Sequence, residues 1–243
     1  MAGNWKMYKT PAETKAFFEA FRPLVEKAAD REIVICPPFT NLEAAAGAVK
    51  GSRIGIGAQN LYWAKEGAFT GEISARMIAG CGCSHVIIGH SERRQYFGET
   101  DETVLKKTVV ALEAGLTPIV CVGERLEQRE AGETEAVLRA QVRDGMAGLS
   151  PEQFAKIVIA YEPVWAIGTG KTATPEIAAD AHRVIREEVR AAFGAAADAA
   201  RILYGGSVKP DNTKTLMSKE EIDGVLVGGA SLEAASFAAI VNY

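Results

Sequence analysis

The fold is decided by the stretch Ile157-Val158-Ile159-Ala160-Tyr161, which leads directly into Glu162-Pro163-Val164-Trp165. Its first five residues are apolar without the alternation of a half-exposed strand, a pattern typical of a strand buried on both faces. Strands of this kind pair in parallel, and a parallel pair needs a crossover helix to return the chain. The stretch therefore predicts a parallel sheet covered by helices.

Similar short apolar segments recur along the whole chain. The predicted strands are Ala2–Lys6, Ile33–Cys36, Arg53–Ala58, His85–Gly89, Pro118–Val122, Ile157–Tyr161, Ile202–Tyr204 and Val225–Val227. Longer segments with helical character lie between many of them, among them Pro11–Ala29, Glu102–Ala114, Leu126–Ala147, Pro175–Phe193 and Leu232–Val241. The chain thus alternates strand and helix from end to end.

The number and length of these units predict the architecture. Eight strand–helix units in 243 residues match a (β/α)8 barrel, which takes about 250 residues. We therefore expect an α/β protein with one domain, residues 1–243 forming a single (β/α)8 barrel. An open doubly wound sheet has the same local alternation and remains the alternative, because sequence period alone does not show whether a sheet closes.

Composition excludes several classes of protein. Apolar residues make up 48% and charged residues 24% of the chain, which argues against disorder and fibrous repeats. The net charge is −4 without a basic cluster, so we expect no nucleic-acid partner. No stretch reaches the roughly 18 apolar residues of a membrane span, and Met1–Lys6 holds no apolar run of a secretion signal. We therefore expect a cytoplasmic protein that does not bind membranes.

The cysteines and histidines do not predict a metal site. Four cysteines lie in or beside apolar segments, where a free thiol acts as a small hydrophobe: Cys36, Cys81, Cys83 and Cys121. Cys81, Cys83, His85 and His90 do not have the spacing of a zinc finger or a redox motif. On a strand, His85 and His90 would point to opposite faces, since they are an odd number of residues apart.

Two ionisable residues follow buried strands at the expected catalytic end of the barrel. Glu162 lies among apolar groups that would raise its pKa, which suits a general base, although a solvated glutamate fits the position equally well. His90 precedes Ser91, a candidate helix cap, and a helix N-terminus would lower the pKa of His90 and keep it neutral. A core histidine bonded to a backbone carbonyl is the alternative, and spacing alone favours it.

The first, seventh and eighth strands end with different residue types. Asn4 and Lys6 are two residues apart and would share one strand face, which argues against an ordinary surface lysine. The seventh and eighth strands lead into Gly205-Gly206-Ser207 and Gly228-Gly229-Ala230-Ser231. Bare backbone amides at these two places form the phosphate site that recurs in barrels, and tight turns are the alternative reading.

The glycine-rich stretch around Gly168-Thr169-Gly170 resembles two nucleotide-binding motifs but fits neither. A Walker A loop requires a glycine where Trp165 stands, and Pro163 and Trp165 separate these glycines from their strand. The stretch therefore predicts a lid with two hinges.

Six segments together resemble a known family. They are Asn4-Trp5-Lys6-Met7, Gly57-Ala58-Gln59-Asn60, Gly89-His90-Ser91-Glu92-Arg93-Arg94, Ala160-Tyr161-Glu162-Pro163-Val164-Trp165-Ala166-Ile167-Gly168-Thr169-Gly170, Tyr204-Gly205-Gly206-Ser207-Val208 and Val227-Gly228-Gly229-Ala230-Ser231-Leu232. They look like the signature segments of the triosephosphate isomerase family and run in family order over the whole chain. The span around Glu162 is highly specific, whereas the glycine pairs alone are not.

The resemblance implies a TIM barrel that interconverts dihydroxyacetone phosphate and D-glyceraldehyde 3-phosphate through an enediolate, in glycolysis and gluconeogenesis, with no metal or cofactor. It implies that Glu162 moves the proton between adjacent carbons and that neutral His90 moves protons between the two oxygens. Lys6 would stabilise the developing negative charge, with Asn4 hydrogen-bonding beside it and Glu92 as the ion-pair partner of the lysine.

The resemblance also implies which residues bind substrate. Asn4 and Lys6 would contact it, and the phosphate would be held by backbone amides at Gly168, Ser207, Gly228 and Gly229.

A long loop predicts a partner surface. It runs from Asn60 to Gly71 and carries more aromatic surface than a solvated connection needs, in Tyr62, Trp63 and Phe69. The resemblance implies a homodimer through this loop, in which Thr70 reaches the catalytic region of the other subunit.

Two other functions remain as alternatives. An aldolase-type barrel would need a Schiff-base lysine at an inner strand end, and the sixth strand offers Glu162 instead. A non-catalytic phosphosugar-binding barrel would keep the glycine clusters but has no use for Glu162, His90 and Lys6 together.

Overall fold

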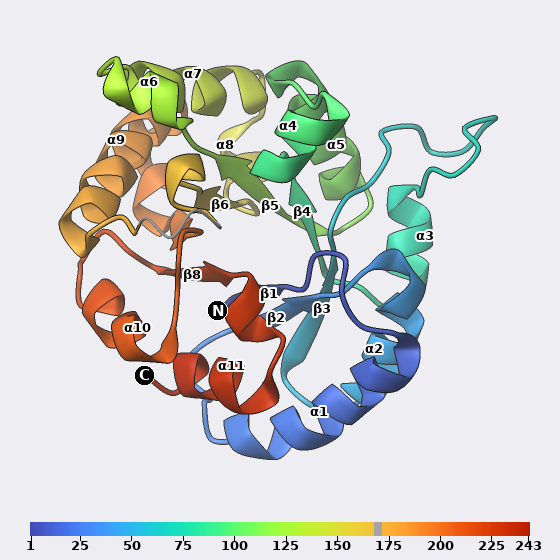
Figure 1. Cartoon of the computed structure of the whole chain (residues 1–243). Helices are drawn as coiled ribbons and strands as arrows, with labels where there is room; N and C mark the ends of the chain where they lie inside the picture. Colours follow the sequence, from blue (N-terminus) through green and yellow to red (C-terminus); the bar gives the residue numbers. More distant parts are fainter. Residues whose placement is uncertain (168–171) are drawn as a thin grey trace.

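The structure is a computed structural model that describes residues 1–167 and 172–243. Within these residues eight parallel strands close into a barrel in chain order, with helices around the outside (Figure 1). The strands are β1 (Ala2–Asn4), β2 (Ile33–Cys36), β3 (Ile54–Ala58), β4 (His85–Ile88), β5 (Thr117–Val122), β6 (Val158–Tyr161), β7 (Arg201–Tyr204) and β8 (Gly224–Val227).

Closure decides between the two predicted architectures. Ala2 of β1 pairs with Val34 of β2 on one side and with Leu226 of β8 on the other, both in parallel. The first strand therefore has no free edge. The single-domain (β/α)8 barrel is confirmed, and the open doubly wound sheet is wrong.

Each predicted strand is present in the structure, and its predicted and observed bounds differ only at the ends of the strand. β2 has the predicted bounds, whereas β1 ends at Asn4 rather than Lys6 and β4 ends at Ile88 rather than Gly89. Lys6 has a φ of 51° and Gly89 a φ of 70°, so both residues turn the chain out of its strand. The other strands differ from prediction by one residue at one end.

The helices follow the strands in a ring. They are α1 (Pro11–Val25), α2 (Leu42–Ala48), α3 (Ala75–Gly80), α4 (Ser91–Phe97), α5 (Asp101–Glu113), α6 (Leu126–Glu130), α7 (Thr134–Gly145), α8 (Pro151–Phe154), α9 (Pro175–Phe193), α10 (Pro210–Met217) and α11 (Ala234–Val241). The bounds of α9 agree with the prediction. The single helix predicted over Leu126–Ala147 is wrong, because the turn at Gly132, with a φ of 73°, separates α6 from α7.

Two layers of apolar side chains make up the core. One fills the barrel itself: Ala2, Val34, Cys36, Ile87, Ile119, Cys121, Val158, Ala160, Leu203 and Leu226. The other lies between the sheet and the helices and includes the aromatic face of α1. Because the barrel is filled, a ligand binds at one end of it and not through its centre.

The buried residue Trp5 connects the end of β1 to this outer layer. Its ring packs edge-on against Phe17 of α1 at a centroid distance of 4.8 Å. Its Nε1 donates to the carbonyl of Ser231, beyond β8, at 3.0 Å. These contacts hold the chain on either side of Trp5, where the candidate site residues Asn4 and Lys6 lie.

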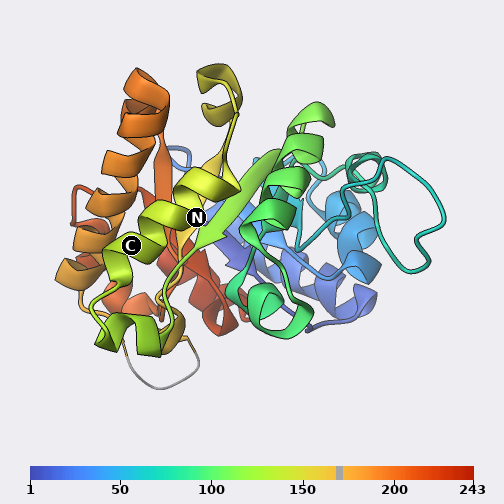
Figure 2. The same cartoon turned by 90° about the horizontal axis from the view of Figure 1, so that it is seen from above.

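The loop after β3 projects away from the ring of helices, as Figures 1 and 2 show. In it Tyr62 stacks on Trp63 at a centroid distance of 4.2 Å and lies 4.6 Å from Phe69, which is 43% exposed. No helix among the described residues is long and apolar enough to cross a membrane.

Candidate active site

A cavity of about 310 Å³ opens at the carboxyl ends of the strands and contains most of the predicted site residues. Its lining includes Asn4, Lys6, His90, Glu162, Ser207, Gly228 and Gly229. A larger hollow of about 490 Å³ lies beside α1 and has none of these residues in its lining. Converging polar groups, and not size, therefore mark the candidate site.

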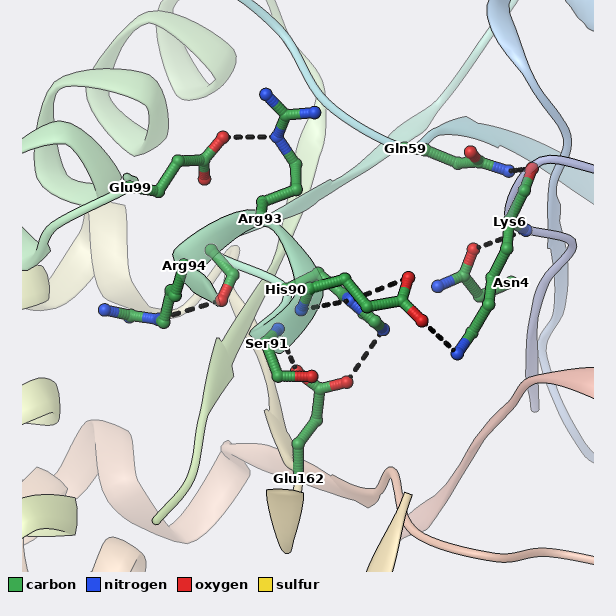
Figure 3. A network of polar contacts seen from close by, with 11 residues as sticks. Asn4, Lys6, Gln59, His90, Ser91, Arg93, Arg94, Glu99 and Glu162 are labelled. Atoms are coloured by element: carbon green, nitrogen blue, oxygen red, sulfur yellow. Dashed lines mark hydrogen bonds and ion pairs between the residues drawn. The ribbon is translucent and has the colours of Figure 1, made fainter. Parts of the chain in front are cut away.

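Glu162 is held at the mouth of the barrel by two donors (Figure 3). Its backbone N–H continues the sheet by donating to the carbonyl of Val122 at 2.8 Å. Its Oε2 accepts the backbone N–H of Ser91 at 2.8 Å, and its Oε1 lies 2.8 Å from Nε2 of His90. The side chain is only 2% exposed, so this carboxylate is buried beside the cavity.

His90 stands at the N-terminus of α4, and its ring geometry defines its tautomer. The backbone N–H of Glu92 donates to Nδ1 at 3.2 Å. Since Nδ1 accepts, the proton of a neutral imidazole is on Nε2, which then donates to Glu162. In its neutral form this histidine therefore directs an N–H at the carboxylate.

The pKa of Glu162 is lowered, whereas the sequence predicted that it would be raised. Burial raises it, as expected, but the charge and hydrogen bond of His90, the N–H of Ser91 and the Lys6 ammonium together outweigh burial. The pKa of this carboxyl therefore lies below its usual value. Consequently Glu162 is ionised at neutral pH and is able to accept a proton.

The pKa of His90 also differs from the prediction. Burial lowers it, but the Glu162 carboxylate and then Glu92 outweigh burial, so the pKa is raised. The sequence argument considered only the helix N-terminus and could not include a carboxylate from another strand. The raised pKa belongs to the arrangement in which the carboxylate faces the ring, and a carboxylate that turned away would remove its main cause and favour the neutral imidazole.

Lys6 reaches the cavity through its backbone conformation. Its φ of 51° is unusual for a residue with a side chain. Its Nζ lies 2.6 Å from Oε1 of Glu92, and its backbone N–H donates to Oδ1 of Asn4 at 3.0 Å. Gln59 donates from Nε2 to the carbonyls of Lys6 and Cys36, at 2.9 Å and 2.8 Å. Asn4 and Lys6 do meet in one cavity, but the predicted reason, a shared strand face, was wrong.

The predicted phosphate-binding residues are partly described. Ser207, Gly228 and Gly229 line the same cavity as Lys6. The eighth-strand glycines lead into a 3-10 turn at Gly229–Ser231, and α11 begins only at Ala234, later than predicted. Gly168 lies outside the described residues, and so do Thr169, Gly170 and Lys171 of the predicted lid.

Sequence reasoning missed two charged residues near the site. Glu124 is fully buried and accepts from Nε1 of Trp165 at 2.8 Å and from the hydroxyl of Tyr161 at 3.1 Å. Arg94 bridges the ends of β4 and β5. The available signal for Glu124 was a carboxylate two residues after the end of the buried strand β5. Among the described residues no group of three or more histidine, cysteine or acidic side chains could hold a metal.

Comparison with known proteins identifies the family. The family model described as triosephosphate isomerase matches residues 1–243. The chain belongs to the triosephosphate isomerase family. It is 74% identical to the triosephosphate isomerase of Solibacter usitatus over 100% of this chain and 98% of the relative. It is 57% identical to that of Citrifermentans bemidjiense, covering 100% of this chain and 97% of the relative.

A solved structure agrees with this assignment. The crystal structure of triosephosphate isomerase from Bartonella henselae superposes with a TM-score of 0.90 at 40% identity, covering 100% of this chain and 97% of the other. The protein is therefore a triosephosphate isomerase family enzyme that interconverts dihydroxyacetone phosphate and D-glyceraldehyde 3-phosphate in glycolysis. The aldolase-type and non-catalytic alternatives are wrong.

Proposed function

We propose that Glu162 is the base of this isomerisation. The observation that carries the proposal is a buried carboxylate with a lowered pKa, which lies in the lining of the cavity and 2.8 Å from Nε2 of His90. Glu162 would remove the proton next to the substrate carbonyl and return it to the adjacent carbon, so that the carbonyl and hydroxyl exchange places. To do so, the carboxylate must first give up a hydrogen bond from Ser91 or His90.

His90 would then transfer protons to and from the two oxygen atoms of the substrate. Once Glu162 turns to the substrate, the Nε2–H of His90 becomes free to face the substrate oxygens. The negative charge left by proton removal develops on the carbonyl oxygen, giving the enediolate. A neutral imidazole can donate to one oxygen and take back a proton from the other, and the Glu92 N–H at Nδ1 favours the tautomer that donates from Nε2.

Lys6 and Asn4 would stabilise the negative charge in this site. Asn4 and Lys6 line the same cavity as Glu162, and Figure 3 shows the two side chains beside each other. An ammonium aimed at the developing enediolate is worth more in a dry cavity than in water. We also propose that Asn4 and Lys6 contact the bound substrate directly.

The phosphate would be bound at the other side of the cavity. Ser207, Gly228 and Gly229 follow β7 and β8, the usual place of a phosphate in this fold. A glycine has no side chain to keep a phosphate away from its backbone N–H. Gly168 is proposed as a further amide donor on the family resemblance alone.

The experiment that tests these roles is Glu162→Gln. The amide keeps the shape of the side chain but cannot accept the proton, so we expect kcat to fall by about 10² to 10⁴-fold. Inhibition by inorganic phosphate should be largely unchanged, because its binding groups are intact. A variant with a near-normal kcat would remove Glu162 from its proposed role.

We further propose a homodimer through the loop Asn60–Gly71, in the cytoplasm. The loop projects from the barrel with exposed aromatic surface that a second copy would cover. All four cysteines are free, which suits a reducing compartment. Thr70→Arg should shift the protein to monomers in sedimentation and lower its activity on dilution. A fully active monomer of the unaltered protein would contradict the proposed dimer.

A further inference from the structure

Arg94 occupies the place where the ladder between β4 and β5 ends. The last residue pair is Ile88 with Val120, and the φ of 70° at Gly89 then turns the chain away from β5. Arg94 spans the gap, because its Nε donates to the carbonyl of Gly89 at 2.9 Å and its Nη2 donates to the carbonyl of Cys121 at 3.2 Å. A side chain thus joins the two strands just beyond their backbone hydrogen bonds.

A third contact completes the set of partners of this guanidinium. Its Nη1 donates to Oδ1 of Asp101, the first residue of α5, at 2.6 Å. The side chain is only 18% exposed. The planar guanidinium has donors in a rigid fork that can meet all three acceptors at once, which an ammonium cannot do in the same geometry.

The packing around Gly89 shows how closely Arg94 fits. A side chain at Gly89 would bring its Cβ to 2.7 Å from Cγ2 of Val104 and to 3.2 Å from Nη2 of Arg94. Glycine therefore satisfies both the backbone conformation and the space that Arg94 leaves. The peptide between Gly89 and His90 is confined from two sides.

The two carbonyls that Arg94 binds adjoin the proposed acid–base pair. The Gly89 carbonyl belongs to the same peptide unit as the backbone nitrogen of His90. The Cys121 side chain is buried, and after burial the neighbouring Glu162 carboxylate is the next cause that raises the pKa of its thiol. Fixing these carbonyls therefore restrains His90 directly and the strand beside Glu162 indirectly.

We propose that Arg94 is a positioning residue for the isomerisation, which holds the Gly89–His90 peptide against β5 so that the imidazole keeps its orientation in the cavity. The proposal rests on the proposed role of His90. Arg94 itself does not line the cavity and acts only through the backbone. Small displacements of a catalytic group are costly, since about 1 Å can reduce the rate by 10²-fold.

The kinetic test compares three variants of the full-length protein. Arg94→Met removes all three contacts, and Arg94→Lys keeps the charge without the fork. Both should lower kcat by about 10-fold or more with little change in KM, because substrate-binding groups stay in place. The control, Asp101→Asn, loses the ion pair but keeps the carbonyl bridge, and its kcat should stay close to normal. Equal losses in Asp101→Asn and Arg94→Met would overturn the proposal.

A spectroscopic measurement separates positioning from a loss of stability. The chain has only three histidines, so the imidazole ¹⁵N signals of His85, His90 and His182 can be assigned individually. In Arg94→Lys and Arg94→Met the His90 signals should shift, while those of His85 and His182 stay unchanged and report an intact fold. If kcat falls without any change at His90, or if all three histidines change together, Arg94 does not act by positioning.

A failure of the positioning role of Arg94 can be told apart from a failure of the proposed role of His90. If His90→Gln keeps full activity, the role of His90 is wrong whatever Arg94 does. If His90→Gln is impaired but the Arg94 variants retain a normal kcat, the role of His90 stands and the positioning proposal fails. If Arg94→Met does not fold, Arg94→Lys provides the same two measurements.

Discussion

The strand β4 has a histidine at each end, and each histidine faces a glutamate from elsewhere in the barrel. At its start, Nε2 of His85 lies 3.3 Å from Oε1 of Glu32, whose side chain is 45% exposed. Just past its end, Nε2 of His90 lies 2.8 Å from Oε1 of Glu162, whose side chain is 2% exposed. The same pair of residue types thus occupies two very different environments.

The cavities at the two ends have the same volume but different walls. Each measures about 310 Å³. Within the part of the chain that the structure describes, the lining of the cavity at the start of β4 contains no glycine and includes Val34, Ile119 and Leu203. The cavity at the other end is lined by glycines after β7 and β8, so that backbone amides lie close to its space. Glycines in the lining, and not volume or the presence of a histidine–glutamate pair, separate the proposed catalytic end from the other end.

The partners of Glu32 are also all structural. A hydrogen bond from His85 is the main cause that lowers the pKa of Glu32 to about 2, and Arg201 adds to it. The other ring nitrogen of His85 lies 2.8 Å from the hydroxyl of Ser84. This pair therefore contributes to stability, whereas the pair at the other end is the proposed acid–base pair.

Single replacements of His85 and His90 should have the largest and most different effects. His90→Gln should lower kcat by about 10² to 10⁴-fold, because a carboxamide cannot pass protons between the substrate oxygens. His85→Gln should leave kcat close to normal and lower the stability instead. Steady-state kinetics and urea unfolding of both variants measure this, and a similar loss of kcat in both would contradict the assignment of the two ends.

The third histidine, His182, has a backbone carbonyl as its partner where His85 and His90 have a carboxylate. His182 of α9 is fully buried, its Nδ1 lies 3.0 Å from the carbonyl of Glu221, and its Nε2 has no partner among the described residues. Burial lowers its pKa to about 4, from 6.5. The unfolded chain therefore takes up this proton first as the pH falls, so the stabilising contribution is complete above pH 6.5 and is lost between pH 6.5 and 4.

The expected loss from His182 across that window is about 3 kcal/mol of the free energy of unfolding. Urea unfolding measured at a series of pH values gives the slope. In His182→Gln the slope between pH 6.5 and 4 should become flatter than in the unaltered protein. An identical slope in both proteins would show that His182 does not titrate as its burial predicts.

The smallest expected effect comes from Glu32, which is partly exposed. Its pKa is lowered from 4.5 to about 2, so its contribution is present above pH 4.5 and is lost as the pH falls toward 2. Because solvent screens this pair, we expect a contribution of only about 1 kcal/mol. Glu32→Gln should remove that acid-dependent loss and leave kcat unchanged. A fall in kcat would mean that the two ends of the barrel are coupled.

Position after a buried strand was the most informative local signal for the site. Glu162 and His90 were both found this way, and the structure brings them into contact. The strand alternation argument for Lys6 failed, because the chain leaves β1 at Asn4 and Lys6 takes a left-handed conformation held by Asn4, Gln59 and Glu92. Such a turn depends on Gln59 and Glu92 from two distant segments, which no local pattern contains.

The directions of the two pKa shifts were also beyond local reasoning. In the sequence, Glu162 and His90 are 72 residues apart, and nothing near either of them shows that the two meet. Each of the two groups is the main influence that opposes burial on the other, and their distance exists only in the folded chain. Arg94 was overlooked for the same reason, since its acceptors lie on two different strands.

The alternation of buried strands and helices can be read from the sequence alone. So can the identity of the residues that follow the carboxyl ends of those strands, such as Glu162 and His90. These features are local, because the burial of a strand on both faces and the period of a helix are written in neighbouring residues. Only the tertiary structure decided that β1 pairs with β8 and that His90 meets Glu162. Closure and pKa values depend on distances between residues far apart in the chain, and folding alone sets those distances.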